Sequence, residues 1–387
     1  MKFNYSPSSP MACTGQDSIA SVQRAVSSKS SVPALEGILL KAEREGMTLC
    51  GFDLELGMTT RLPARIEESG SVILGARLFS DIIRRLPGDL VKLTVDEKNV
   101  TTIESGASEF SIAGMGAEEY PELPSVSGAG EFSVQNDLLK GMIRQTIFAV
   151  ADSDAKPIHT GTLFELSGGR LRLVSVDGYR LAMREEILTG EGAEGTDGLD
   201  APAGSSEEMS FVVPGKTLTE VMKLLPEDDG TVGIQVGRRH ILFTIGSYTV
   251  ISRLLEGEFL DYRSAIPSAC QTEVKVNTRE FINSVERVSL LITDRLKSPV
   301  RCVFGEDSIH LSCSTAIGRA NDQFSASIQG AGLEMGFNNR YLLDALRNTE
   351  GDEVRIQLNG PLSPMKIMPP EGDSYLFLVL PVRLKAN

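Results

Sequence analysis

The segment Pro214-Gly215-Lys216-Thr217 contains residue types that hold nucleotide phosphates in P-loop proteins. The P-loop motif, G-x-x-x-x-G-K-[ST], uses Gly-rich backbone N–H groups to cradle the phosphates. Here Ser210 stands at the position of the first glycine, and an apolar run at 211–213 follows it. A turn from a strand into a helix explains these residues better, so a nucleotide-binding enzyme that uses Lys216 is the weaker alternative.

The other side chains that could carry chemistry are scattered along the chain. The histidines stand in unrelated contexts without metal-ligand spacing, and they are His159, His240 and His310. A G-x-S-x-G motif does not occur. Asp177, which could be taken for a catalytic acid, is expected to be a turn residue before Gly178. We therefore expect no catalysis, no metal and no cofactor.

The composition excludes other classes. The 387 residues carry 38 Lys+Arg against 52 Asp+Glu, a net charge of −14, which argues against a uniformly basic surface that coats nucleic acid or anionic membranes. No secretory signal follows Met1, and the apolar run 376–380 is too short to cross a membrane. The five cysteines are odd in number and form no C-x-x-C pair. They are expected to be free thiols of a cytoplasmic protein.

An internal repeat positions all these residues. Segments 77–86, 216–225 and 340–348 each show apolar residues at i, i+3 and i+4, which predicts three short amphipathic helices. An acid occupies the same register in each, at Asp81, Glu220 and Asp344, and a basic residue follows three positions later. The acids are about 125–140 residues apart, a spacing that suits whole domains.

Strands flank each of these helices. Short apolar strands are expected before them at 72–74, 211–213 and 333–335, and alternating strands after them at 91–95, 232–236 and 354–358. The earlier half of each repeat predicts a helix followed by two strands, such as 161–166 and 171–175 around a turn at Gly168-Gly169. These helices are expected near 19–27, 138–150 and 279–291, with Asp137 and Thr278 as N-caps of the last two.

Each repeat is thus an α+β unit with two helices and antiparallel sheets. Linkers are expected at 125–130 and 267–271, which gives domains at 1–127, 128–267 and 268–387. Segment 190–208, rich in glycine and acidic residues, is expected to be a mobile surface loop. The six predicted helices together carry 13 basic and 7 acidic residues, a net +6, which leaves −20 for the rest; the count is taken over 17–29, 77–86, 137–148, 216–225, 278–288 and 340–348. This segregation matters only if all six helices face one space.

Short motifs occur along the whole chain, namely Met1-Lys2-Phe3, 32–39, Gly51-Phe-Asp-Leu-Glu55, 119–124, 176–181, 257–262 with Ile266-Pro267, Gly336-Phe-Asn338 and Leu380-Pro-Val-Arg383. In this order they resemble the motifs of the bacterial DNA polymerase III beta subunit, the beta sliding clamp family. The resemblance implies a non-catalytic processivity factor. It implies a head-to-tail homodimeric ring of six domains, with helices inside, antiparallel sheets outside and duplex DNA in the hole.

In such a ring, basic residues of the helices would contact phosphate without reading sequence, which permits sliding. The residues expected to face DNA are Arg24, Lys29, Arg84, Lys140, Arg144, Lys156, Lys223, Arg279 and Arg347. Of these, Lys29 and Lys156 match positions where the family places DNA-contacting basic residues. Pro157 and Ile158 replace positions that can be aromatic in relatives, so stacking on single-stranded DNA is not expected there.

The family also implies an apolar cleft between the second and third domains. It captures short peptides of the polymerase III alpha subunit, other polymerases, the clamp loader and repair proteins. The implied lining is Val176, Gly178, Tyr179, Arg180, Leu181, Leu260, Ala265, Asn338, Tyr341, Leu378, Leu380, Pro381, Val382 and Arg383. Arg180 and Arg383 are expected to be rim donors. Leu260, Ser264 and Ala265 differ from the residues common in relatives, so a differently shaped wall is expected.

The dimer interface is expected to join an edge strand of the first domain to the third domain of a second copy. The residues expected there are Phe110, Ser111, Ile112, Leu290 and Leu291. Left uncovered, they would form an exposed apolar patch beside an unpaired strand edge.

Overall fold

The computed structural model describes residues 2–5, 15–87, 90–128, 130–152, 155–188 and 208–384. The described chain divides into two units. Unit 1 comprises residues 1–137 and 219–254, and unit 2 comprises 138–218 and 255–387. Most of segment 190–208, predicted to be a mobile loop, lies outside the described residues. None of the described helices is long and apolar enough to cross a membrane.

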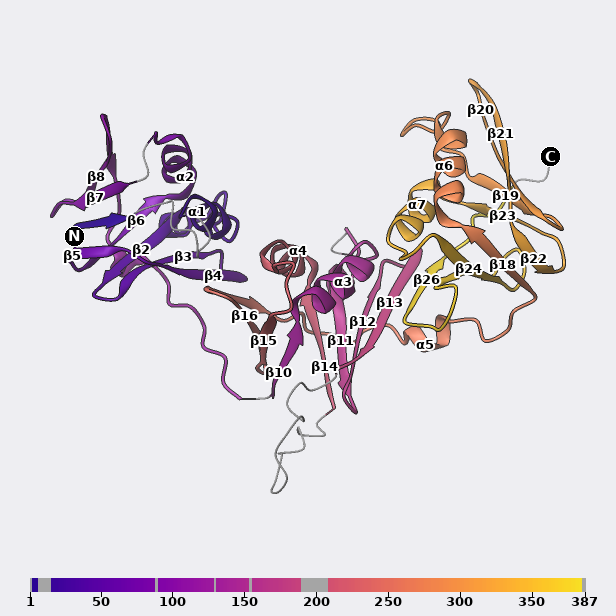
Figure 1. Cartoon of the computed structure of the whole chain (residues 1–387), viewed down its shortest axis with the longest axis horizontal. Helices are drawn as coiled ribbons and strands as arrows, with labels where there is room; N and C mark the ends of the chain where they lie inside the picture. The colour runs from indigo at the N-terminus through magenta and orange to yellow at the C-terminus, as the bar shows by residue number, and fades with distance from the viewer. Residues whose placement is uncertain are drawn as a thin grey trace. The chain divides into compact units, whose positions relative to one another are not determined.

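Unit 1 contains two antiparallel sheets (Figure 1). The five-stranded sheet has the order β5 (Arg65–Glu68), β1 (Lys2–Tyr5), β7 (Val91–Val95), β8 (Val100–Ser105) and β9 (Ser108–Ala113). The eight-stranded sheet has the order β10 (Gly130–Gln135), β15 (Thr231–Val236), β16 (His240–Ile245), β17 (Tyr248–Arg253), β4 (Leu56–Leu62), β3 (Gly46–Phe52), β2 (Gly37–Glu43) and β6 (Gly70–Gly75).

Unit 2 repeats this plan. Its nine-stranded sheet has the order β14 (Met209–Pro214), β11 (Gly161–Ser167), β12 (Arg170–Val176), β13 (Arg180–Ile187), β26 (Tyr375–Val379), β25 (Met365–Met368), β24 (Glu353–Leu358), β18 (Thr272–Asn277) and β22 (Ser327–Gly330). Its four-stranded sheet has the order β21 (Gly318–Ser325), β20 (Ser308–Thr315), β19 (Val300–Phe304) and β23 (Leu333–Phe337).

Five of the six predicted helices begin within two residues of their predicted starts, and the first begins four residues before its predicted start. They are α1 (Gly15–Gln23), α2 (Ala76–Arg85), α3 (Asn136–Ile147), α4 (Gly215–Leu224), α6 (Thr278–Ser289) and α7 (Asn339–Arg347), and a single turn, α5 (Tyr262–Ala265), was not predicted. α1 packs on α2 and α6 packs on α7 (Figure 1). Apolar residues face the sheets, as Phe281 and Val285 of α6 do, because both are fully buried.

Two predicted N-caps are wrong. The side chain of Asn277 accepts a hydrogen bond from the Glu280 amide at 3.0 Å, so Asn277 is the cap of α6 and Thr278 is its first residue. Asp137 lies in the first turn of α3. There its charge stabilises the positive end of the helix dipole.

The repeat is visible as one backbone contact made three times. The amides of Met115, Leu255 and Val382 donate to the carbonyls of Ile73, Val212 and Gly336, at 2.9, 3.0 and 2.8 Å. From each of these positions, a ladder of paired residues runs across one sheet of the repeat. It runs Ile73–Leu39–Cys50–Thr59–Thr249 in unit 1 and Val212–Leu163–Val174–Met183–Leu376 in unit 2, and Gly336–Arg301–Ser312–Asn321 for the third repeat.

Sheets cross from one repeat to the next at two places. At the first junction, β17 of the second repeat pairs with β4 of the first, with Ser252 opposite Leu56. At the second junction, β26 of the third repeat pairs with β13 of the second, with Val379 opposite Arg180. The chain therefore has three repeats but two compact units, because both junctions are continuous sheets. The domain boundaries at 127/128 and 267/268 stay a prediction.

Candidate functional site

The second junction holds most of the residues expected to line a cleft. β12 and β13 meet in a tight turn, where Oδ1 of Asp177 accepts hydrogen bonds from the amides of Tyr179 and Arg180 at 2.8 and 3.0 Å. Gly178 has φ 89°, a conformation that favours glycine. Asp177 is thus a turn residue, as predicted. The Leu380 amide donates to the Tyr179 carbonyl at 2.9 Å, which ties the end of β26 to this turn.

Exposed apolar side chains gather around this turn. The ring of Tyr179 is 60 % exposed and stacks on that of Tyr341 at 5.7 Å, and Leu380 is 40 % exposed. Tyr341 follows the α7 cap, Asn338, whose side chain accepts from the Arg340 amide at 2.9 Å. Val382, also exposed, is held by its backbone bond to Gly336. Such a surface suits an apolar peptide.

Three of the predicted lining residues are instead buried behind this surface. Val176, Leu181 and Leu378 are at most 4 % exposed, and they pack in one apolar cluster with Leu163, Val174 and Leu376. Other members of the cluster were not among the predicted lining residues, namely Ile158, Tyr262, Met368 and the partly buried Phe259. Leu260, the residue after Phe259, is 41 % exposed, and Ala265 is exposed in α5.

Arg180 does not match its predicted role as an exposed rim donor. It is 8 % exposed. Its Nε donates to Asp177 Oδ2 at 2.9 Å, its Nη1 binds Asp344, and its guanidinium lies 4.8 Å from the centroid of the Tyr341 ring. These interactions occupy it inside the chain and stabilise the junction. Arg383, in contrast, is exposed, and together with Val382 it lines a cavity of about 1000 Å³ on the third repeat.

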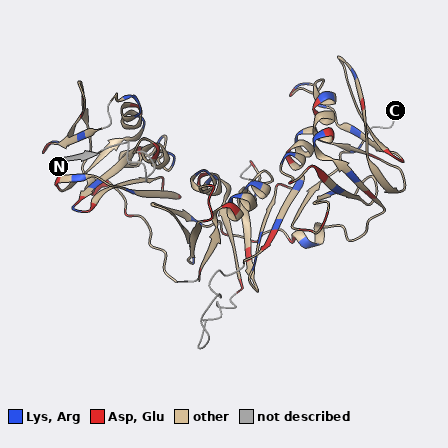
Figure 2. Cartoon of the chain, in the orientation of Figure 1, with Lys and Arg blue, Asp and Glu red and all other residues tan. Residues whose placement is uncertain are grey.

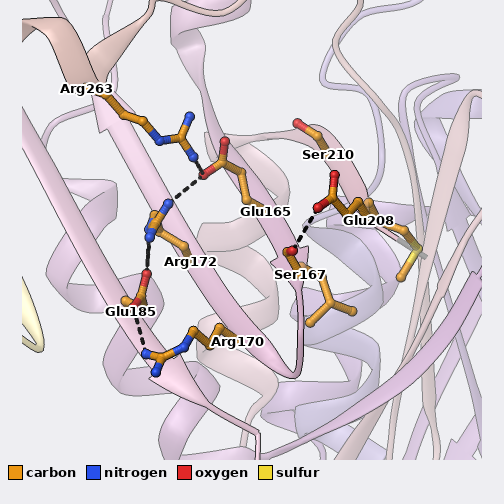
Figure 3. Close-up of a pocket in the computed structure, with 10 residues that line it drawn as sticks. Glu165, Ser167, Arg170, Arg172, Glu185, Glu208, Ser210 and Arg263 are labelled. Atoms are coloured by element: carbon orange, nitrogen blue, oxygen red, sulfur yellow. Dashed lines mark hydrogen bonds and ion pairs between the residues drawn. The ribbon is translucent and has the colours of Figure 1, made fainter. Parts of the chain in front are cut away.

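A polar network fixes α5 beside the apolar cluster (Figure 3). The Tyr262 hydroxyl donates to Glu165 Oε2 at 2.5 Å, and Arg172 Nη1 donates to the Tyr262 oxygen at 3.0 Å. Arg263 also donates to Glu165, at 2.8 Å, and Arg172 Nε donates to Glu185. Figure 3 shows Glu165, Arg172, Glu185 and Arg263 of this network around a cavity of about 470 Å³ on the strands β11 to β13. Their opposite charges compensate one another.

The residues expected to face DNA differ in whether their side chains form ion pairs inside the chain. Lys29, Lys156 and Arg279 are exposed and make no ion pair within the described residues. Five others are paired inside the chain, namely Arg24 and Lys223 with Glu220, Arg84 with Asp81, Arg144 with Glu350 and Arg347 with Glu286. Lys140 is partly buried in α3. A paired cation must exchange its carboxylate for a phosphate, which weakens the contact.

The charge excess on the helices is smaller than predicted. α1 ends at Gln23, so Arg24 and Lys29 follow it, and the six helices carry 11 basic and 7 acidic residues, a net +4. The amides after Gln23 make tighter i→i−3 contacts, such as Ala25 to the Val22 carbonyl at 3.0 Å. Lys and Arg occur on helices and strands of both units (Figure 2).

The described residues around Lys216 do not form a P-loop, the structure that the alternative function requires. The residues before Gly215 form β14, which pairs with β11 up to Pro214, so they are an extended strand and not a phosphate-binding loop. The described cysteines are free, with Cys50, Cys302 and Cys313 buried and Cys270 exposed. His159 packs against Phe259, and burial and the nearby Lys156 lower its pKa. Among the described residues no group of His, Cys, Asp or Glu could hold a metal ion.

Comparisons with known proteins cover the whole chain. Models of the DNA polymerase III beta subunit match residues 16–124 (N-terminal domain), 133–261 (central domain) and 263–383 (C-terminal domain). The beta sliding clamp of Bacillus subtilis is 35% identical over 378 residues, 95% of this chain and 97% of that protein. That of Staphylococcus aureus (strain N315) is 32% identical over 370 residues, 93% and 94% of the two chains.

Solved structures agree. The sliding clamp of Bacillus subtilis matches with a TM-score of 0.90 and 34% identity, covering 100% of both chains. A Pseudomonas aeruginosa sliding clamp bound to griselimycin matches with a TM-score of 0.89 and 28% identity, over 99% of this chain and 100% of that one. The chain therefore belongs to the DNA polymerase III beta subunit family, the bacterial beta sliding clamps, which are non-catalytic processivity factors in DNA replication.

Proposed function

We propose that this sliding clamp acts as a head-to-tail homodimeric ring around duplex DNA, with its helices toward the DNA. The ring tethers the replicative polymerase, the clamp loader and other DNA-processing proteins in the cytoplasm through the apolar surface of the second junction. The proposal of a dimer rests on one observation. Each protomer has two unpaired strand edges that correspond to the two strands of a junction. β9 ends the five-stranded sheet and β21 ends the four-stranded sheet.

The repeat specifies how these edges would pair. β9 corresponds to β17 and β26, because Ala113 stands two residues before Met115 as Arg253 and Leu380 stand before Leu255 and Val382. β21 corresponds to β4 and β13. Applying the register of both junctions places Ile112 opposite Gly318, Ser111 opposite Arg319 and Phe110 opposite Ala320 of a second copy.

The exposure of these edges supports the pairing. Phe110 is 40 % exposed, Ile317 65 % and Leu290 80 %, and association would bury this apolar surface. A free edge of this kind promotes aggregation unless it is covered. Leu291, partly exposed, lies next to Gly318, whose added Cβ would lie 3.9 Å from its side chain.

Cysteine cross-linking tests the register. In a background with Cys13 and Cys270 replaced by serine, the Ser111→Cys/Arg319→Cys variant should form a covalent dimer under mild oxidation. Paired residues on neighbouring strands have Cβ atoms about 4.5–5.5 Å apart, so an approach of about 1 Å brings them within the range of a disulfide. The Ser111→Cys/Asp322→Cys variant, three residues out of register, should cross-link poorly. Equal yields from the two variants would rule out this pairing.

The grip on DNA should be topological. The free charges of Lys29, Lys156 and Arg279 support a loose, sequence-independent contact, while paired arginines keep that contact weak. After loading, the clamp should stay on circular DNA through a high-salt wash and leave when the DNA is cut. A protein held only by phosphate contacts would lose affinity for circular and linear DNA alike, and that outcome would contradict the ring.

A further inference from the structure

The third repeat carries a basic pocket where the second repeat carries the apolar cluster. The ladder that reads Leu163, Val174 and Met183 in the second repeat reads Arg301, Ser312 and Asn321 in the third. Two residues further along the strands, the pair Val176–Leu181 corresponds to the pair Ser314–Arg319. Identical backbone positions therefore present charged and hydroxyl groups in place of aliphatic ones.

The cavity on this face has a volume of about 1000 Å³. Five basic side chains line it, and no acidic residue does; they are Arg295, Lys297, Arg301, Arg319 and Arg383. Arg301 pairs with Glu334 outside the lining, whereas the other four make no ion pair within the described residues. Five converging cations with one internal partner form a strong positive field, which favours an anionic ligand.

The first two repeats show what covers this face of the sheet. In the first, Tyr120 and the partly buried Leu123 pack on the ladder residues Leu39 and Cys50. In the second, Tyr262 and Phe259 pack on Leu163 and Val174. The covering segments are acidic: 116–124 contains three glutamates and no basic residue, and 255–262 contains Glu256, Glu258 and Asp261. Within the described residues, no such segment lies over the third pocket.

We propose that this pocket binds an acidic segment, containing an aromatic residue, of a protein that docks on the clamp. The segment would lie on the third repeat as 116–124 and 255–262 lie on the first and second. Val382 and Arg383 line the pocket and stand two and three residues after Leu380 of the peptide-binding surface, so one extended peptide can reach both. In the dimer, Glu109 of the second copy would stand beside Asn321, one carboxylate against the excess of cations.

DNA is the less suitable anion. Along β19 and β20 the buried Cys302 and Leu311 point toward α6, which packs on these strands. Because side chains alternate along a strand, Arg301 and Ser312 point to the opposite face. DNA is expected on the helix side, so the pocket opens away from it.

The test uses the full-length clamp and a dye-labelled peptide with the sequence of residues 116–124, Gly-Ala-Glu-Glu-Tyr-Pro-Glu-Leu-Pro. Fluorescence anisotropy at low salt should show saturable binding. The Arg295→Glu/Lys297→Glu variant should weaken it at least tenfold, and so should replacing the three glutamates of the peptide by glutamine. The control variant, Arg238→Glu/Lys275→Glu, makes the same charge change at exposed positions outside the pocket and should alter affinity less than twofold.

Three outcomes overturn the proposal: no saturable binding, equal loss from the two double variants, or displacement of the peptide by a DNA duplex with the same loss in the pocket variant. The last would identify a nucleic-acid site. The Leu380→Asp variant should still bind the acidic probe, and the pocket variant should still be retained on circular DNA. Failure of the pocket is therefore separable from failure of the ring or of the apolar peptide surface.

Discussion

The two strand junctions share a backbone plan and differ in side-chain chemistry. In the first, Oδ1 of Asp53 accepts from the amides of Glu55 and Leu56 at 3.0 and 2.7 Å, the same turn that Asp177 forms in the second. The Arg253 amide donates to the Glu55 carbonyl at 2.9 Å, as Leu380 does to Tyr179. At each junction an arginine of the earlier repeat also reaches the helix acid of the later one, Arg24 to Glu220 and Arg180 to Asp344.

Apart from the Arg24–Glu220 ion pair, the first junction is closed by neutral contacts. The Tyr248 hydroxyl and Ser18 share a buried hydrogen bond at 3.2 Å, Thr60 and Ser247 share a partly buried one at 3.3 Å, and Leu123 lies close over Gly57. The second junction buries its arginine between aromatic rings and leaves Tyr179 and Leu380 exposed. The comparison shows that the pairing of strands joins the repeats, and that the residues around the turn decide whether apolar side chains at the junction are covered or exposed.

The largest difference should follow removal of the two arginines. Arg180→Ala should lower the free energy of unfolding by about 3 kcal/mol, because it leaves Asp177 without its buried partner. Arg24→Ala should cost under about 1 kcal/mol, since the Arg24 side chain is 32 % exposed and Lys223 still pairs with Glu220. Urea unfolding followed by circular dichroism measures both. Equal losses would mean that the two ion pairs are equivalent.

Peptide binding should depend on the second junction alone. Tyr179→Ala and Leu380→Asp should each weaken binding of a polymerase III alpha subunit peptide at least tenfold, about 1.4 kcal/mol, because they remove exposed apolar contacts. Glu55→Ala, at the position equivalent to Tyr179, is the matched control and should leave the affinity unchanged. Fluorescence anisotropy gives the dissociation constants. An effect of Glu55→Ala as large as that of Tyr179→Ala would contradict the assignment.

The two turns should respond in opposite directions to an exchange of residues. Leu54 has φ 76°, where an L side chain is strained by about 1–2 kcal/mol, and Gly178 has φ 89° at the equivalent position. Gly178→Leu should therefore destabilise the protein by about 1 kcal/mol. Leu54→Gly should stabilise it by less, because glycine adds entropy to the unfolded chain. Thermal unfolding would show a lowered and a raised midpoint; a shift in the same direction for both would refute this account.

The smallest effect concerns acid. Burial alone would raise the pKa of Glu165, but hydrogen bonds from Tyr262, Arg263 and Arg172 and the charge of Arg263 hold it below its usual value. A carboxylate whose pKa is lowered by folding stabilises above its unfolded pKa, about 4.3, and loses that contribution as the pH falls through the folded value. The amide protection factors in α5, which are corrected for the intrinsic pH dependence of exchange, should thus fall below about pH 4.3.

The matched comparison is Tyr120, which anchors the covering segment of the first repeat through a neutral bond to the Cys50 carbonyl at 3.2 Å. Protection factors around Tyr120 should not change over the same acid range. In Glu165→Gln, the protection factors in α5 should lose their pH response. A response that persists in this variant would assign the effect to another group.

Local pattern was enough to predict the helices, the strands beside them and the turn at Asp177, because these depend on periodicity and on short-range hydrogen bonds. It failed where the partner is distant. Arg180 was expected at a rim, and its burial depends on Asp344, 164 positions away. Local pattern also overextended the first helix past Gln23, since Ala25 and Val26 continued the apolar pattern while the backbone tightened into turns.

The pairing of β13 with β26 has a consequence during synthesis. Arg184 lies opposite Tyr375, so the edge of β13 has no partner until about 190 further residues have left the ribosome. At 5–20 residues per second, that wait lasts about 10–40 s. β13 carries Arg180, Arg184, Glu185 and Glu186, charges that discourage pairing with a wrong strand. The charged side chains that later form ion pairs in the folded protein would thus first protect the nascent chain from misassembly.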